Sequence, residues 1–325
     1  MIRYLLLGFG LWLVCLASLV FGARPGVGLA DLSALLSSAE MRDANGIVVA
    51  EMRLPRTLGG LLAGGALGCA GALIQTLTRN PLADPGLLGV NAGAALGIVA
   101  SVTVFGPLPS GALAMPALAG GFTALLAVWA VGAAARSPLT LVLAGAALTA
   151  LLGALLRSLI LLDPFALDAY RDWAVGALDG VRSGLLVVPA ILAAIGAGLA
   201  VPAARRLDAL ALGDDLAQAL GANLVAARLL TLAAVGILAA AAVLVAGPLA
   251  FVGLVAPYLA RATGVQTSLA LAIVSAGFGA ALLLTADIAG RIVAPGIVIE
   301  AGLGVTLIGG TFLILLVRRQ ARNPA

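Results

Sequence analysis

The stretch that decides the fold is residues 53–97, RLPRTLGGLLAGGALGCAGALIQTLTRNPLADPGLLGVNAGAALG. Two arginines, Arg53 and Arg56, stand directly before an uncharged apolar run at 58–77. About 20 such residues are enough to cross a bilayer core as a helix. The polar island at 78–85 contains two prolines, which cannot continue a helix, and a second apolar run follows it. The segment therefore predicts a membrane hairpin.

The composition is also that of a membrane protein. Of the 325 residues, 62% are hydrophobic and 10% are charged, whereas ordinary globular proteins carry about 25% charged residues. The sequence contains no lysine and no histidine, so a P-loop lysine, a Ser-His-Asp triad and a histidine zinc site are all excluded. We expect no catalytic residue, metal site or cofactor in this chain, and any ATP hydrolysis must reside in a partner. The scattered arginines form no basic run, so nucleic-acid binding is not expected.

The apolar segments predict an all-α integral membrane protein with ten transmembrane helices, forming a single transmembrane domain over residues 1–325. The first segment is longer than the ~7–15 apolar residues of a signal peptide, so we interpret it as a helix. Arginines are in modest excess on the face that carries both termini, which predicts that both termini are cytoplasmic. Residues 23–56 and 163–183 are predicted outer connections, and 204–228 is a predicted inner connection. The ten predicted passes are 4–22, 57–77, 86–106, 111–133, 138–161, 184–203, 229–246, 248–262, 268–288 and 299–317.

Four glycines of the first long run, Gly60, Gly64, Gly68 and Gly71, recur at helical spacing. Small residues at this spacing allow two helix backbones to approach closely in a membrane. The pattern predicts tight packing inside a helical bundle and carries no information about a substrate.

Several motifs together resemble a known family of transporters. They are RLPR at 53–56, QTLTRNPLADPGLLGVNAGAALG at 75–97 and VAGPLAFVGLVAPYLAR at 245–261. They resemble the FecCD-like permeases that import iron chelates and vitamin B12, the membrane half of type II ABC importers, and the resemblance covers nearly all of 50–318. It implies a non-enzymatic permease of the bacterial cytoplasmic membrane that pairs with a second copy of itself. It also implies two ATP-binding cassette subunits, which bind ATP and Mg²⁺, and a periplasmic or lipid-anchored substrate-binding protein.

The inner segment 204–228 predicts a short amphipathic helix outside the membrane. Gly213 breaks the preceding turn, Asp214 is suited to cap the helix, and Gly221 suits its end. Such a helix either rests on lipid or lies in a groove of a partner protein, and the residues alone do not decide between them. The resemblance favours the partner, since ALGDDLAQALG resembles the family loop that contacts the ATPase. The residues expected at that contact are Leu212, Gly213, Asp214, Asp215, Leu216 and Leu220.

Three arginines at the outer boundary are candidates for binding a partner. Arg53 and Arg56 are three residues apart, so both point to one side of a helix, and Arg291 precedes the last helix. The resemblance implies that these positions form salt bridges with acidic residues of the substrate-binding protein, for which guanidinium forks are well suited. The alternative is anchoring to lipid phosphates. The resemblance also places an inner gate near Ser137, Pro138, Leu139 and Thr140.

The expected function is import of an iron chelate, a ferric siderophore or haem, by ATP-driven alternating access. Import of cobalamin by the same family stays open, because the predicted walls contain no decisive ligand. The alternative from another class is a secondary transporter driven by an ion gradient, which places an acid or a histidine near mid-membrane. The candidate here is Asp287, at the outer end of a predicted helix, and this position disfavours that alternative.

Overall fold

The computed structural model describes residues 2–22, 24, 26–35, 43–134, 138–211, 213–219, 221–293 and 299–322, and all regular structure within them is helical. Short helices connect the long ones: α2 (Ala44–Ile47), α7 (Pro164–Ala174) and α9 (Asp214–Ala219). The main helices are α1 (Ile2–Val20), α3 (Leu54–Thr78), α4 (Val90–Phe105), α5 (Ala114–Ala134), α6 (Pro138–Leu162), α8 (Val187–Leu210), α10 (Leu224–Ala246), α11 (Val252–Ala262), α12 (Ser268–Ile292) and α13 (Ala301–Arg322).

These helices have the length and composition of membrane spans. Within the described residues, seven helical segments are long and apolar enough to cross a bilayer, and α4, α11 and α13 add shorter apolar helices. Each of the ten predicted passes falls on one of these main helices. The prediction of an all-helical, multi-pass membrane protein is therefore confirmed, while the number of crossings stays a prediction.

The first predicted outer connection, 23–56, ends in a helix that the sequence analysis did not predict. The helix of the second pass begins at Ala44 instead of residue 57, because a π-helical turn, Val48–Arg53, joins α2 to α3 without a break. Asp43 starts this rod by accepting a hydrogen bond from the backbone N–H of Gly46 at 2.7 Å. The rod therefore extends beyond the apolar run that defined the prediction.

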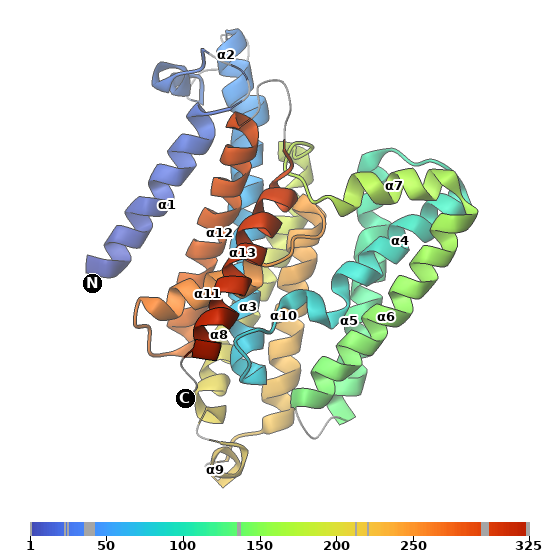
Figure 1. The fold of residues 1–325 in the computed structure, drawn as a ribbon, viewed down its shortest axis with the longest axis vertical. Coiled ribbons are helices and arrows are strands. Elements are labelled where there is room, and N and C mark those ends of the chain that lie inside the picture. Colours follow the sequence, from blue (N-terminus) through green and yellow to red (C-terminus); the bar gives the residue numbers. More distant parts are fainter. Residues whose placement is uncertain are drawn as a thin grey trace.

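The second predicted outer connection, 163–183, contains a helix that the sequence analysis did not expect. Asp163 caps α7 by accepting a hydrogen bond from the N–H of Phe165 at 2.9 Å, and Pro164 occupies the first turn, where no N–H is needed. Ala166 and Trp173, two turns apart, face the same small core as residues of α4 and α6. Helix α7 lies across one end of the α4–α6 group (Figure 1).

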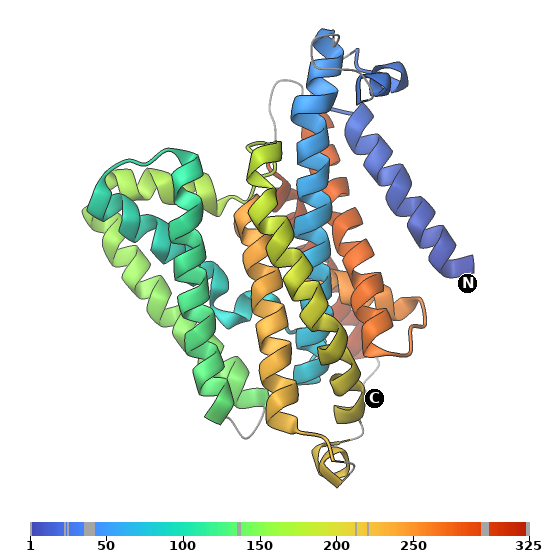
Figure 2. The same cartoon turned by 180° about the vertical axis from the view of Figure 1, so that it is seen from behind.

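The long helices form a central bundle with a second group beside it. Helix α3 packs against α12, α10 and α11, and α8 covers α10. Helices α4, α5, α6 and α7 form the side group, which Figure 2 shows from behind. Helix α1 lies at the edge, against α12 and α3. Helix α9 projects beyond the long helices at one end, and α1 begins and α13 ends toward that same end (Figure 1).

Glycines bring the central helices into backbone contact. Gly64 and Gly68 of α3 lie against α12, and a Cβ added at Gly68 would overlap the carbonyl oxygen of Ser275. A Cβ at Gly71 would overlap the carbonyl oxygen of Gly253 in α11. Close backbone approach through small residues is a main source of helix association in membranes. The predicted tight packing is confirmed at these three positions.

The turn after α3 is fixed by local backbone chemistry. Arg79 ends α3 in the left-handed region, at φ 50°. Asp84 then caps the short 3-10 turn Pro85–Leu88 by accepting a hydrogen bond from the N–H of Gly86 at 2.8 Å. Gly89, at φ 74°, closes that turn and starts α4, a conformation that glycine adopts without strain. These residues produce the predicted reversal of the chain.

Asp84 gives a testable pH dependence. Burial raises the pKa of its carboxyl from 3.8 to about 6, against the opposing effect of the hydrogen bond from Gly86. The folded state holds the proton more tightly than the unfolded state, so this contribution favours folding below about pH 4 and is lost as the pH rises through about 6. We expect Asp84→Asn, which keeps the acceptor oxygen without the charge, to raise the melting temperature at about pH 7.5 and to change it little near pH 4.

The control for this measurement is Asp163→Asn. Asp163 also precedes a proline and caps a helix, but its cap hydrogen bond is exposed. Fluorimetric melting curves in detergent should show no pH-dependent gain for the control. A lower melting temperature for Asp84→Asn than for the natural chain at about pH 7.5 would contradict the expected direction.

Candidate functional site

The predicted coupling segment forms the isolated helix α9. Its ends are set by Gly213 and Gly221, with φ of 103° and 83°. The carbonyl of Gly213 accepts the first helical hydrogen bond, from the N–H of Ala217, so Gly213 is the N-cap and Asp214 is the first helical residue. The prediction that Asp214 caps the helix is therefore wrong by one position, because a residue with φ of 103° already supplies the change of direction. The predicted stop at Gly221 is confirmed.

Helix α9 presents one side to the bundle and one side outward. The side chain of Ala217 is fully buried in the main core, whereas Leu216 is 50% exposed and Asp215 is exposed. An apolar side chain held at the tip of a projecting helix is available to a partner. The predicted contact residues Leu212 and Leu220 lie outside the described residues.

Two polar links join the end of α8, the helix that precedes α9, to the centre of the bundle. Arg79, at the end of α3, donates a hydrogen bond to the carbonyl oxygen of Leu210 at 2.6 Å. Asp208 accepts a hydrogen bond from the N–H of Ser268, at the start of α12, at 2.8 Å. The last turn of α8 is therefore held by both α3 and α12.

A buried glutamine joins α3 to α11 near the same end of α3. The side-chain amide of Gln75 donates to the carbonyls of Ala83, Gly253 and Leu254 at 3.2–3.3 Å, and its oxygen accepts a hydrogen bond from Arg261 at 2.6 Å. Gln75 is 2% exposed, and its three bonds to backbone carbonyls are buried, whereas the bond from Arg261 is partly buried. The sequence analysis missed this link, since its only signal was one polar residue within an apolar run.

At the opposite end, two of the three arginines predicted to dock a binding protein, Arg56 and Arg291, hold a single acid. The carboxylate of Asp287, on α12, is fully buried and accepts hydrogen bonds from Arg56 Nε at 2.9 Å and Nη2 at 2.6 Å. Arg291 lies 3.1 Å from the other carboxylate oxygen. We refer to Asp287, Arg56 and Arg291 as the Asp287 cluster; it joins α3 to α12.

The first helix is attached to this cluster. Arg291 donates to the carbonyl oxygen and the hydroxyl of Ser18 at 3.2 and 3.1 Å, and the Ser18 hydroxyl lies 2.7 Å from that of Thr57. Arg53 donates to the carbonyls of Leu19 and Val20 at the end of α1. The carbonyls left without helical partners at that end are thereby satisfied.

The geometry changes the prediction for the three arginines. Arg53 and Arg291 are 4% and 5% exposed, and their donors are used within the chain. Direct salt bridges from these two residues to a partner do not fit this arrangement. The side chain of Arg56 keeps 12% exposure, so of the three it is the one within reach of a carboxylate outside the chain.

The structure describes three of the four residues predicted at an inner gate. Ser137 lies outside the described residues, and Pro138, Leu139 and Thr140 form the first turn of α6. Their assignment to a gate stays a prediction.

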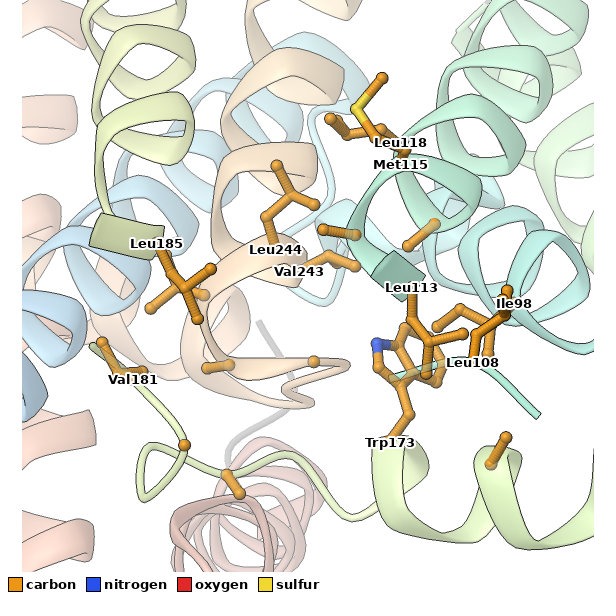
Figure 3. Close-up of a pocket in the computed structure, with 18 of the residues that line it drawn as sticks. Ile98, Leu108, Leu113, Met115, Leu118, Trp173, Val181, Leu185, Val243 and Leu244 are labelled. Atoms are coloured by element: carbon orange, nitrogen blue, oxygen red, sulfur yellow. The ribbon is translucent and has the colours of Figure 1, made fainter. Parts of the chain in front are cut away.

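An apolar cavity of about 550 Å³ separates the side group from the central bundle. Leu108, Leu113 and Trp173 lie on one side of it, and Val243 and Leu185 on the other (Figure 3). Two acids are among the residues that line it, Asp168 and Asp179, and both are exposed. The described residues of this wall offer dispersion contacts and include no positively charged donor.

Comparison with known proteins gives one consistent family. The model of the FecCD transport family matches residues 10–319. The ferric enterobactin transport system permease protein FepD of Escherichia coli (strain K12) is 41% identical over 95% of this chain and 92% of its own length. The Fe(3+)-citrate import system permease protein YfmD of Bacillus subtilis (strain 168) is 35% identical over 96% and 95%. A solved structure of an inward-facing metal-chelate type ABC transporter has a TM-score of 0.84 at 25% identity, covering 96% of this chain and 97% of that one.

Proposed function

The chain belongs to the FecCD transport family and is a permease of the iron-chelate type of ABC importer, and from this premise we propose that it imports a ferric siderophore or haem by ATP-driven alternating access. The observation that best supports this mechanism is α9, a short helix that projects from the bundle with an exposed leucine. A subunit without its own nucleotide site needs such a contact to receive work from an ATPase.

The proposed assembly contains two copies of this chain, two ATP-binding cassette subunits and a substrate-binding protein. ATP and Mg²⁺ bind to the cassette subunits, and the chain itself carries no cofactor. Closure of the cassette subunits moves the two α9 helices together. The bonds of Arg79 and Asp208 to the last turn of α8 and its neighbours then carry the motion to α3 and α12.

The orientation follows from the same helix. With α9 facing the cytoplasm, the ends of α1 and α13 that point toward α9 are cytoplasmic (Figure 1). We propose ten crossings of a bacterial cytoplasmic membrane in this orientation, with residues 1–325 as one permease domain. The Asp287 cluster then lies at the periplasmic boundary. There Arg56 is proposed to meet an acid of the binding protein, held in place by its bonds to Asp287.

The two alternatives are weaker. An ion-coupled transporter needs a buried acid that exchanges a proton or cation, and Asp287 is the buried acid among the described residues. Two arginines hold its carboxylate, so it is poorly placed for that exchange. Cobalamin import remains within reach of the same scaffold, but FepD and YfmD are named for iron chelates, which favours an iron chelate here.

The coupling role of α9 is tested by Leu216→Ala. We expect this change to reduce co-purification of the cassette ATPase and ATP-driven uptake by about tenfold, because burial of a leucine side chain is worth about 1.5–3 kcal/mol and 1.4 kcal/mol is a factor of ten. Gln218→Ala truncates a second exposed side chain on the same helix and should leave both quantities unchanged. Equal behaviour of the two variants would place Leu216 against lipid instead.

The function as a whole is tested by reconstitution. The chain with its neighbouring ATPase and binding protein should take up ⁵⁵Fe-chelate into proteoliposomes in a vanadate-sensitive manner. The chain alone should not concentrate cargo. Uphill uptake by the chain alone, without any ATPase, would overturn the proposal.

A further inference from the structure

A second cavity, of about 990 Å³, lies between the side group and α13. Residues of α4, α6, α7, α13 and the turn at 248–250 line it. It is distinct in chemistry from the apolar cavity, although Trp173 contributes to both. Its volume is within the range of small-molecule sites, about 300–1,000 Å³.

Among the described residues that line this cavity, the charged ones are two arginines, Arg157 of α6 and Arg171 of α7. Within the described part of the chain, neither guanidinium forms a hydrogen bond or an ion pair. The arginines of the Asp287 cluster differ, because each of them has a carboxylate. The cavity therefore carries positive charge that the protein does not neutralise.

The position of Arg157 makes that charge costly unless a ligand neutralises it. Arg157 lies inside the apolar span Leu143–Leu162. An arginine near a helix end often extends toward the interface. Here Nη1 of Arg157 lies 3.7 Å from the place of a Cβ on Gly153, one turn back along α6 and also in the cavity wall. Arg157 is exposed in the single chain and is one of the residues that line the cavity, and a charge without a partner within a membrane span marks a ligand pathway.

Four neutral polar residues also line the cavity: Tyr170, Asn91, Thr149 and Thr306. The hydroxyls of Thr149 and Thr306 donate to the carbonyls of Gly145 and Gly302, so Tyr170 and Asn91 are the neutral side chains with donors for a ligand. Together with two guanidinium groups these donors suit a ligand with several oxygen acceptors, since planar guanidinium forks bind anionic oxygens in pairs.

We propose that this cavity binds the chelate during transport and selects chelates with net negative charge through Arg157 and Arg171. This inference rests on the proposed function and narrows its cargo. Catecholate and carboxylate complexes of iron(III) are anionic and present oxygens to the two arginines. In a ferric hydroxamate the charges of ligand and metal cancel, and the same cavity then leaves two cations without a partner.

The test is equilibrium binding of two ⁵⁵Fe probes, a ferric tris-catecholate and a neutral ferric trihydroxamate, to the permease–ATPase complex in nanodiscs. The natural chain should bind the catecholate at least tenfold more tightly. The double variant Arg157→Gln with Arg171→Gln should lose at least tenfold in catecholate affinity, about 1.4 kcal/mol, and leave hydroxamate binding unchanged. The double variant Arg157→Lys with Arg171→Lys keeps the charge and should retain most of the preference.

The matched control is Arg182→Gln, an exposed arginine that lines neither cavity. It should bind both probes as the natural chain does, and size-exclusion profiles establish that all variants are folded. Unchanged catecholate affinity in the glutamine double variant, or equal loss of both probes, would overturn the inference. If either of these results were accompanied by intact ATP-driven uptake, the inference would be wrong and the proposed function would be unaffected. If the natural importer showed no ATP-driven iron uptake at all, the proposed function would be wrong.

Discussion

Asp287→Asn is expected to unfold the end of the molecule opposite α9 under conditions in which the natural chain is stable. The substitution leaves the guanidinium groups of Arg56 and Arg291 buried without a counter-charge. Removal of one partner from a buried ion pair costs about 3–5 kcal/mol, because the remaining charge keeps its desolvation penalty. The loss reaches α1 as well, since Arg291 holds Ser18. Melting temperature in detergent and the yield of monodisperse protein measure the effect.

The control for this change is Asp168→Asn, on the exposed side of α7. It removes the same charge from the same kind of side chain and should shift the melting temperature little, because an exposed carboxylate has no buried partner. If Asp287→Asn melts with the natural chain, the Asp287 cluster does not stabilise the fold. If Asp287→Asn is strongly destabilised, a loss of uptake by this variant follows from unfolding and is not evidence about docking of the binding protein.

Gly68→Ala is expected to destabilise the contact between α3 and α12 strongly. The new Cβ would overlap the carbonyl oxygen of Ser275, and the obstacle is backbone, which cannot rotate away. Overpacking costs about 1–3 kcal/mol and more where the backbone must move. We expect α3 and α12 to separate locally, with a lower melting temperature and a faster rate of proteolysis.

Gly65→Ala, on the same helix, is expected to change the stability in the opposite direction. The nearest atom to its added Cβ is the carbonyl oxygen of Ala276 at 3.7 Å, an ordinary contact. Because alanine favours a helix over glycine by about 1 kcal/mol, this variant should be neutral or slightly more stable. A gain of stability in Gly68→Ala would contradict this prediction, because it would show that the backbones of α3 and α12 leave room for a methyl group at Gly68.

The bundle was largely predictable from the sequence, because length and hydropathy alone define membrane helices. Glycine spacing predicted the contacts of Gly64, Gly68 and Gly71, because glycines repeated on one side of a helix allow another helix backbone to approach closely. Helix α7 was missed, because four aspartates in 163–183 obscured the apolar side formed by Ala166 and Trp173.

The contacts of the site residues were less predictable, because the sequence shows where the charged residues are but not which of them form ion pairs. Arg56 and Asp287 are 231 positions apart, and only the packing of α3 on α12 brings them together. The family resemblance directed attention to the arginines and away from the acid between them. Arg157 and Arg171 likewise gain significance only when α6 and α7 place them in one cavity.

The Asp287 cluster also sets an order of events during synthesis. Arg56 leaves the ribosome 231 residues before its carboxylate. At a translation rate of about 5–20 residues per second, Asp287 is synthesised on the order of 10 to 45 seconds after Arg56. During this time lipid headgroups are the counter-ions available to Arg56. Formation of the Asp287 cluster is thus a late step of biogenesis. A chain that stops before α12 differs from a finished one by unneutralised charge at the membrane surface.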